Sequence, residues 1–115
     1  MIQPGEVYIA DFEEAGPHPV IIVSRESLNR GRYVLAVVCT SARLTVRRVL
    51  PNCVPFGSNQ FGFKTDCVAQ CENLLSIDKA QLDLANGPIG CLDEMAMREV
   101  IKAIGYVIDS DCEPV

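Results

Sequence analysis

The chain has 115 residues, of which 49% are hydrophobic and 22% are charged, and this composition predicts one globular domain, residues 1–115, with a core of its own. No apolar run reaches the ~18 residues that cross a membrane, and the first residues lack the basic and apolar regions of a signal peptide, so we expect a soluble, cytoplasmic protein with no membrane partner. The net charge of −5 argues against a general nucleic-acid binder, because non-specific phosphate binding depends on Lys and Arg.

Short apolar segments bounded by turn-forming residues occupy most of the chain before residue 93. Residues 20–23 and 33–39 are rich in β-branched side chains and too short for buried helices, which predicts strands covered on both faces. The other expected strands and turns follow from alternating polarity and from Gly, Pro and Asn. They are strands at 6–12, within 49–56, at 66–73, at 74–77 and at 89–92, loops at 41–48 and 57–62, and a helical turn near 78–82.

The pattern changes at Asp93, which is a favourable helix N-cap. Apolar side chains then recur at i, i+3, i+4 and i+7, the spacing of an amphipathic helix that ends near Ile108. The acidic residues at 109–113 form a short tail that we expect to fray. Several short strands closed by one C-terminal helix predict a mainly β (α+β) fold, a small barrel of the SH3-like type, with an OB-type barrel as the alternative.

Positive charge is concentrated in the first half of the chain. Between residues 17 and 48 there are six arginines and one acid, a local charge of 6 − 1 = +5, while the remainder carries 4 − 14 = −10. One interpretation is a basic patch on an acidic body; the other is a solvated face whose arginines pair with the molecule's own carboxylates. The six are Arg25, Arg30, Arg32, Arg43, Arg47 and Arg48.

Six cysteines raise the question of disulfides or a metal site. They lie mostly in apolar contexts, so we expect buried thiols rather than a disulfide framework at Cys39, Cys53, Cys67, Cys71, Cys91 and Cys112. Zinc needs four ligands at close spacings, and the nearest pair, Cys67 and Cys71, has no histidine close by in the sequence. We therefore expect no metal and no cofactor.

The sole histidine precedes the first of the two central strands. Antiparallel pairing of 20–23 with 33–39 places the start of one strand beside the end of the other, so His18 is expected near Thr40 and Ser41. An imidazole beside two hydroxyl groups is suited to acid-base chemistry. A structural histidine packed against a proline is the alternative that the sequence leaves open.

The order of motifs along the chain resembles the MazF/PemK family of toxin-antitoxin toxins. The resemblance covers essentially the whole chain, and no single motif carries it. The matching features are GEVYIADF at 5–12, the proline-led apolar strand at 19–24, a strand that ends in Thr40 and Ser41, CVPF at 53–56, DCVAQCENLLSID at 66–78 with Lys79 after it, and the final helix.

The resemblance implies an SH3-like barrel, a homodimer and a metal-independent endoribonuclease that cuts single-stranded RNA at short sequences. It also implies an antitoxin with an acidic tail that lies over the active site. The family usually has an arginine where this chain has His18, whereas the threonine at the end of the next strand is kept as Thr40. Where the family commonly has acid, glutamine, apolar and arginine, this chain has Glu72, Asn73, Leu74 and Leu75.

Two functions from different classes fit these features. As an endoribonuclease, the chain would use His18 for proton transfer and Thr40 and Ser41 as donors to the phosphoryl oxygens. Arg43, Arg25 and Asn73 are the candidate RNA-binding residues, with Asn73 reading a base edge. The alternative is a catalytically degenerate dimeric relative that binds nucleic acid or an antitoxin peptide without cleavage.

Overall fold

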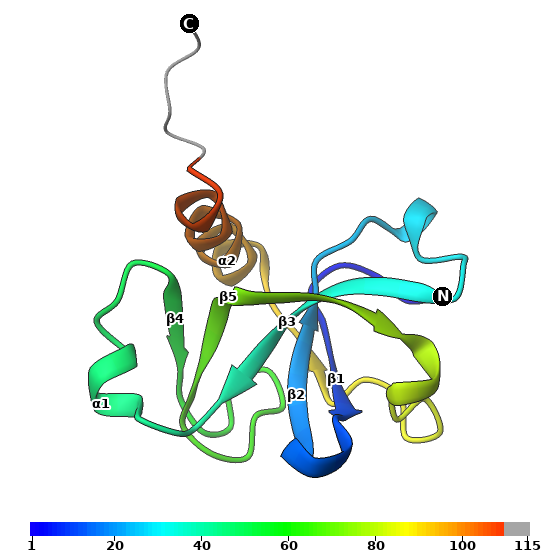
Figure 1. Cartoon of the computed structure of the whole chain (residues 1–115), viewed down its shortest axis with the longest axis horizontal. Helices are drawn as coiled ribbons and strands as arrows, with labels where there is room; N and C mark the ends of the chain where they lie inside the picture. The colour runs from blue at the N-terminus through cyan, green and yellow to red at the C-terminus, as the bar shows by residue number, and fades with distance from the viewer. Residues whose placement is uncertain (110–115) are drawn as a thin grey trace, which may run out of the picture.

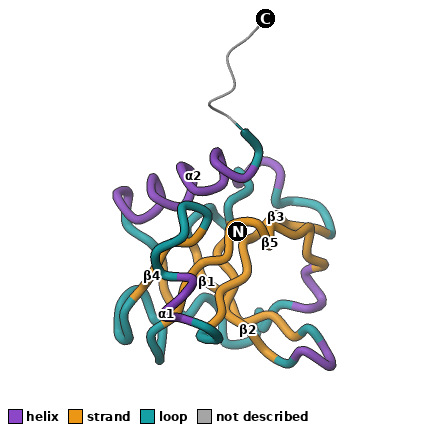
Figure 2. The backbone as a smooth tube through the Cα atoms, turned by 60° about the vertical axis from the view of Figure 1, so that its left-hand side comes forward, coloured by secondary structure: helices purple, strands orange, loops and turns teal. Residues whose placement is uncertain are grey.

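The computed structural model describes residues 1–109. Within them, six antiparallel strands form one sheet in the order β4-β5-β3-β2-β1-β6. The sheet curls into a half-barrel, and α2 (Glu94–Val107) runs across it (Figures 1 and 2). The strands are β1 (Glu6–Asp11), β2 (Pro17–Ile22), β3 (Tyr33–Thr40), β4 (Cys53–Phe56), β5 (Cys67–Asp78) and β6 (Gly90–Cys91).

Four short helical segments join the strands. They are the 3-10 turns η1 (Glu13–Ala15), η2 (Glu26–Leu28) and η3 (Lys79–Gln81) and the helix α1 (Leu44–Arg47). The segment 41–48 was predicted to be a loop, and this is wrong for 44–47. Arg43 takes a left-handed backbone conformation, φ 53°, and the chain then closes one helical turn, with the Arg47 N–H donating to the Arg43 carbonyl at 3.0 Å.

Both faces of the sheet are covered, as β-branched central strands require. Val37 belongs to the cluster that packs under α2 with Val100 and Ala103, whereas its neighbours Ala36 and Val38 belong to a second cluster on the opposite face. This alternation along β3 follows the two-residue period of a strand. The prediction that the central strands are buried on both faces is confirmed except at Tyr33 and Leu35, which are 50% and 39% exposed.

The segment 66–78 was predicted as two strands, whereas the structure has one long strand with a bulge. Val37 pairs with Leu74 and Val38 pairs with Gln70, so residues 71–73 have no partner on β3. The extra residues interrupt the pairing with β3 while β5 continues as one strand. The polar residues Glu72 and Asn73 therefore mark a bulge within one strand and not a turn between two strands.

The mainly β fold with a C-terminal helix is confirmed. Asp93 caps α2 by accepting the Ala96 N–H at 2.8 Å, as its sequence position predicted. None of the helices within residues 1–109 has the length and apolar character needed to cross a membrane. The predicted tail at 109–113 falls outside the described residues except for Asp109.

Candidate functional site

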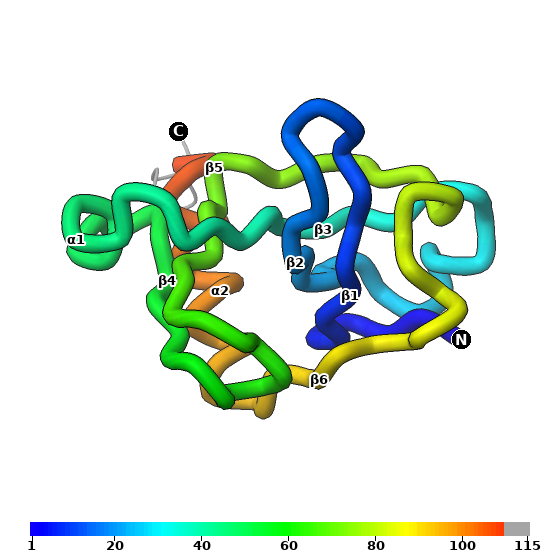
Figure 3. The backbone as a smooth tube through the Cα atoms, turned by 90° about the horizontal axis from the view of Figure 1, so that it is seen from below, coloured from blue at the N-terminus to red at the C-terminus, as the bar shows by residue number. Residues whose placement is uncertain are grey.

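The lower edge of the sheet in Figure 1 gathers the end of β1, the start of β2, the end of β3 and the start of β5. Val20 pairs with Val38 and Ile22 pairs with Ala36, and the same register extended to the edge puts His18 opposite Thr40. Seen from below, the turn between β1 and β2 projects beside β3 and β5 (Figure 3). The predicted proximity of His18 and Thr40 therefore follows from strand pairing alone.

Both nitrogens of the His18 ring face backbone carbonyls. Nδ1 lies 3.3 Å from the Cys39 oxygen, and Nε2 lies 3.0 Å from the Ala15 oxygen in η1. A neutral imidazole can donate to only one of these two carbonyls at a time, whereas a protonated one donates to both. The bond to Cys39 is partly buried and fixes the ring against β3, whereas the bond to Ala15 is exposed and is the one that a substrate can replace. Phe12 packs beside the ring, with the two centroids 6.1 Å apart.

Thr40 keeps its hydroxyl hydrogen available. Its Oγ1 accepts the backbone N–H of Ala42 at 3.1 Å, which fixes the side chain but uses only an acceptor lone pair. The O–H is left to donate to a bound group. Ser41 follows on the exposed side of the same edge.

His18 and Thr40 separate two hollows. The large hollow, about 430 Å³, lies between the β1–β2 turn and the bulge of β5 and is lined by Phe12, Ala15, His18, Val38, Thr40, Ala42, Arg47, Gln70, Asn73 and Leu75. The edge hollow, about 240 Å³, lies on the other side and is lined by Pro17, His18, Pro19, Cys39, Thr40, Ser41, Phe63, Thr65 and Cys67. The imidazole of His18 and the hydroxyl of Thr40 thus lie between the large hollow and the edge hollow. A chain-like ligand that filled both hollows would pass these two groups.

The bulge and α1 furnish the large hollow with polar groups. Gln70 lines the hollow, and its Nε2 donates to the Glu72 carboxylate at 3.0 Å, which also accepts from Asn52 Nδ2 at 2.8 Å. Partial desolvation raises the pKa of Glu72, but these hydrogen bonds and the charge of Arg47 outweigh it and hold the pKa below its usual value. Arg47 donates to the Ala42 carbonyl at 2.8 Å, which places a guanidinium at the wall of the hollow.

The other predicted residues are distributed unevenly. Asn73 lines the large hollow with His18 and Thr40, and Ser41 lines the edge hollow. Arg43 does not line either hollow, and Arg25 follows the opposite end of β2 from His18, next to η2. The roles assigned to all of these residues stay predictions.

Sequence reasoning missed Arg47 and Gln70, which both line the large hollow. The arginine count marked the segment as basic, but which arginine reaches the groove depends on the single helical turn of α1. Gln70 reaches it because the bulge begins at the next residue. Neither feature has a sequence pattern by which it could have been found.

The thiols near the site are reduced and mostly buried. Cys39, Cys53, Cys67 and Cys71 are buried as predicted, Cys91 is exposed against the prediction, and Cys112 lies outside the described residues. A hydrogen bond from the Cys39 thiol lowers the pKa of Cys67 and raises that of Cys39, while burial raises the pKa of Cys71 to about 12. Across residues 1–109, no group of three or more His, Cys, Asp or Glu side chains is placed to hold a metal ion.

A family model described as the PemK-like, MazF-like toxin of type II toxin-antitoxin systems matches residues 3–108. The chain belongs to this family. The matched residues include all six strands, the bulge of β5 and α2. The match confirms the resemblance to the MazF/PemK family that the sequence motifs indicated.

Relatives of known structure or activity agree with the MazF/PemK assignment. Endoribonuclease EndoA of Bacillus subtilis strain 168 is 28% identical over 110 residues, covering 90% of this chain and 91% of that protein. A mycobacterial endoribonuclease solved in complex with its cognate antitoxin superposes with a TM-score of 0.77 at 24% identity, covering 95% and 96% of the two chains. The Mycobacterium tuberculosis toxin MazF-mt6 gives 0.75 at 25% identity, covering 90% and 96%. The predicted SH3-like, MazF/PemK-like fold is confirmed.

Proposed function

We propose that this MazF/PemK-family chain is a sequence-specific endoribonuclease that cleaves single-stranded RNA without a metal ion, acting as a homodimeric toxin in the cytoplasm. The observation that carries the proposal is the position of His18 and Thr40 between the large and edge hollows. A nucleic-acid strand that occupies both hollows crosses these two side chains at a phosphodiester. By analogy with the mycobacterial endoribonuclease solved with its cognate antitoxin, the natural inhibitor is an antitoxin peptide.

The chemistry requires one proton to move and one charge to be stabilised. His18 takes the proton from a ribose 2′-hydroxyl, whose oxygen attacks the adjacent phosphorus. The bond from phosphorus to the 5′-oxygen then breaks, and that oxygen takes up the proton from the imidazolium. The products are a 2′,3′-cyclic phosphate and a 5′-hydroxyl end.

Hydrogen-bond donors hold the phosphoryl oxygens during this step. The Thr40 hydroxyl is pre-aligned by its bond with Ala42, and Ser41 is the second donor. Arg47 adds positive charge from the large hollow. Arg43 and Arg25, the RNA-binding residues expected from the sequence, lie outside both hollows, so we assign them no part in this step. Asn73 reads the edge of the base held in the large hollow.

A second function, binding without cleavage, is favoured by two observations. Both ring nitrogens of His18 are engaged by carbonyls, and Leu75, at a position that is usually basic in the family, leaves that wall of the large hollow apolar. In this case the edge would hold RNA or an antitoxin peptide and release it unchanged.

Incubation of the pure protein with mixed single-stranded RNA in excess chelator separates the two functions. We expect cleavage at a short recurrent sequence, with cyclic-phosphate ends and no loss of rate in chelator. The Thr40→Val protein, purified in the same way, controls for contaminating nucleases. A retarded but uncut RNA supports the binding module, and activity only with an added divalent ion overturns the metal-free mechanism.

A further inference from the structure

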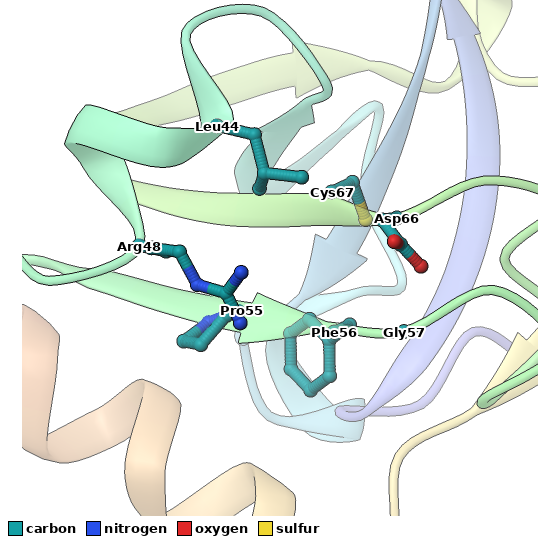
Figure 4. Close-up of a pocket in the computed structure, with 7 residues that line it drawn as sticks. All are labelled: Leu44, Arg48, Pro55, Phe56, Gly57, Asp66 and Cys67. Carbon is teal, nitrogen blue, oxygen red and sulfur yellow. The ribbon is translucent and has the colours of Figure 1, made fainter.

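A third hollow adjoins the proposed cleavage site and has no part in the chemistry above. The side hollow, about 220 Å³, lies between α1 and the ends of β4 and β5. Figure 4 shows the Arg48 guanidinium and the Asp66 carboxylate at opposite ends of it, with Phe56 between them. Its lining residues are Leu44, Arg48, Pro55, Phe56, Gly57, Asp66 and Cys67.

The side hollow adjoins the proposed path of the RNA. Cys67 lines both the side hollow and the edge hollow, and the edge hollow in turn shares His18 and Thr40 with the large hollow. The three hollows therefore follow one another along the edge of the sheet, and we call this row of hollows the track. A base in the side hollow would lie on the far side of the edge hollow from the large hollow.

The two charged groups of the side hollow are held apart and available. Asp66 Oδ1 accepts the backbone N–H of Ser58 at 2.8 Å, which fixes the carboxylate and leaves Oδ2 without a hydrogen bond among the described residues. The ion pairs found within residues 1–109 join Arg32 to Asp78 and Arg98 to Glu94, so Arg48 and Asp66 neutralise neither each other nor a neighbour. A small pocket with a cation at one end, an anion at the other and apolar walls suits a nucleotide better than a wholly apolar ligand.

We propose that the side hollow is a base-recognition subsite that selects guanine in the RNA, an inference that rests on the proposed function. The Watson–Crick edge of guanine presents two adjacent donors, N1–H and the 2-amino group, which the Asp66 carboxylate accepts together. Adenine, cytosine and uracil each offer one donor or amino group there. Leu44, Pro55 and Phe56 contact the apolar faces of the base, and Arg48 binds the phosphate of the same nucleotide.

Titration of the ¹⁵N-labelled protein with mononucleotides tests the subsite without cleavage. GMP at millimolar concentration should shift the backbone amide signals of Ser58, Gly57 and Cys67, and AMP, CMP and UMP should bind at least about tenfold more weakly, since a good bidentate pair discriminates by that much. Guanosine and inorganic phosphate separate the base from the phosphate contribution. Equal shifts with all four nucleotides, or with phosphate alone, overturn the proposal.

Two variants assign the ends of the subsite. Asp66→Asn keeps an oxygen for the Ser58 N–H, so the loop remains anchored, but it should weaken GMP about tenfold because an amide cannot accept both guanine donors. Arg48→Met should weaken GMP and leave guanosine unchanged. Asp83→Asn is the matched control, because the Asp83 carboxylate also accepts a backbone N–H, that of Asn86 at 3.2 Å, away from the track.

RNA cleavage measured beside the titration keeps this proposal separate from the function. A protein that cleaves RNA with a base preference unchanged by Asp66→Asn would overturn the guanine subsite alone. Selective GMP binding by a protein that cleaves no RNA would support the subsite and overturn the endoribonuclease.

Discussion

At the scale of single residues, Thr40 is the side chain whose role is easiest to isolate. Thr40→Val keeps the shape of the side chain and removes the hydroxyl, so it removes both the donor to the phosphoryl oxygen and the acceptor for Ala42. We expect the cleavage rate constant to fall about 10²- to 10³-fold, the usual cost of one oxyanion donor. Single-turnover kinetics on a defined RNA measure it.

Thr40→Ser is the matched control, because serine keeps the hydroxyl and loses only a methyl group. Its rate should stay within about tenfold of the native protein. Equal losses in the valine and serine variants would mean that packing at the strand end, and not hydrogen bonding, controls the rate.

His18 combines a structural and a chemical role, and two substitutions separate them. His18→Ala removes the contacts with Cys39 and Ala15, which should cost about 1–2 kcal/mol of unfolding free energy, and should lower cleavage about 10²-fold. His18→Arg restores donors toward the carbonyls but keeps its proton at neutral pH and so does not transfer it. We therefore expect it to recover stability without recovering cleavage.

Activity that rises in His18→Arg would contradict proton transfer by the histidine. It would show instead that the position needs a permanent cation for phosphate binding, as the arginine usual in the family suggests. Chemical denaturation of both variants is the necessary companion measurement, because a loss of rate in an unfolded protein says nothing about proton transfer.

At the scale of elements, η3 joins the end of β5 to the sheet through one carboxylate. Asp78 accepts the Ala80 N–H at 3.0 Å and pairs with Arg32 at 2.8 Å. The hydrogen bond from Ala80 and then the one from Arg32 lower the pKa of Asp78 below its ordinary value of 3.8. A carboxylate with a lowered pKa in the folded state stabilises the protein above its ordinary pKa, and this contribution is lost as pH falls through the lowered value.

Asp78→Asn should therefore unfold at a lower temperature than the native protein above about pH 4, and the gap should close as the pH falls below that value. Thermal melts followed by circular dichroism between pH 2 and 7 give the two curves. A gap that is constant over the whole range would mean that the asparagine disturbs the turn itself. Arg32→Met, which keeps the Ala80 cap, should show a smaller gap with the same trend.

The elements also show where sequence reasoning works and where it ends. The pairing of β2 with β3 was predictable, since two β-branched runs joined by a short turn have one sensible antiparallel arrangement, and this alone brought His18 to Thr40. The bulge at 71–73 was not predictable. Three residues without a partner on β3 do not produce a recognisable pattern of polar and apolar residues in the sequence of β5. The position of Arg47 at the large hollow was not predictable either. It depends on α1, which is one turn long and begins after Arg43 in a left-handed conformation.

At the scale of the whole molecule, α2 and its C-cap expose several large apolar side chains. Val100 and Ala103 are buried against the sheet, but Ile101 is 56% exposed, Tyr106 58% and Ile108 66%. Ile101 and Ile108 are seven residues apart and share one side of the helix, whereas Tyr106 lies on another. We interpret these exposed apolar side chains as part of an interface, and a second copy of the chain is the partner that the proposed homodimer supplies. In a dimer, these side chains would be shielded from water by the second chain.

We expect sedimentation velocity to give a dimer at micromolar concentration. The double variant Ile101→Glu, Tyr106→Glu should associate at least about tenfold more weakly, because charges buried in an interface without partners are costly. Both side chains are exposed in the monomer, so its melting temperature measured at low concentration should change little. Leu28→Glu, at a side chain 68% exposed on η2, is the matched control and should stay dimeric. If the native protein sediments only as a monomer, the proposed homodimer is wrong. If the double variant is still a dimer, the dimer interface does not involve α2.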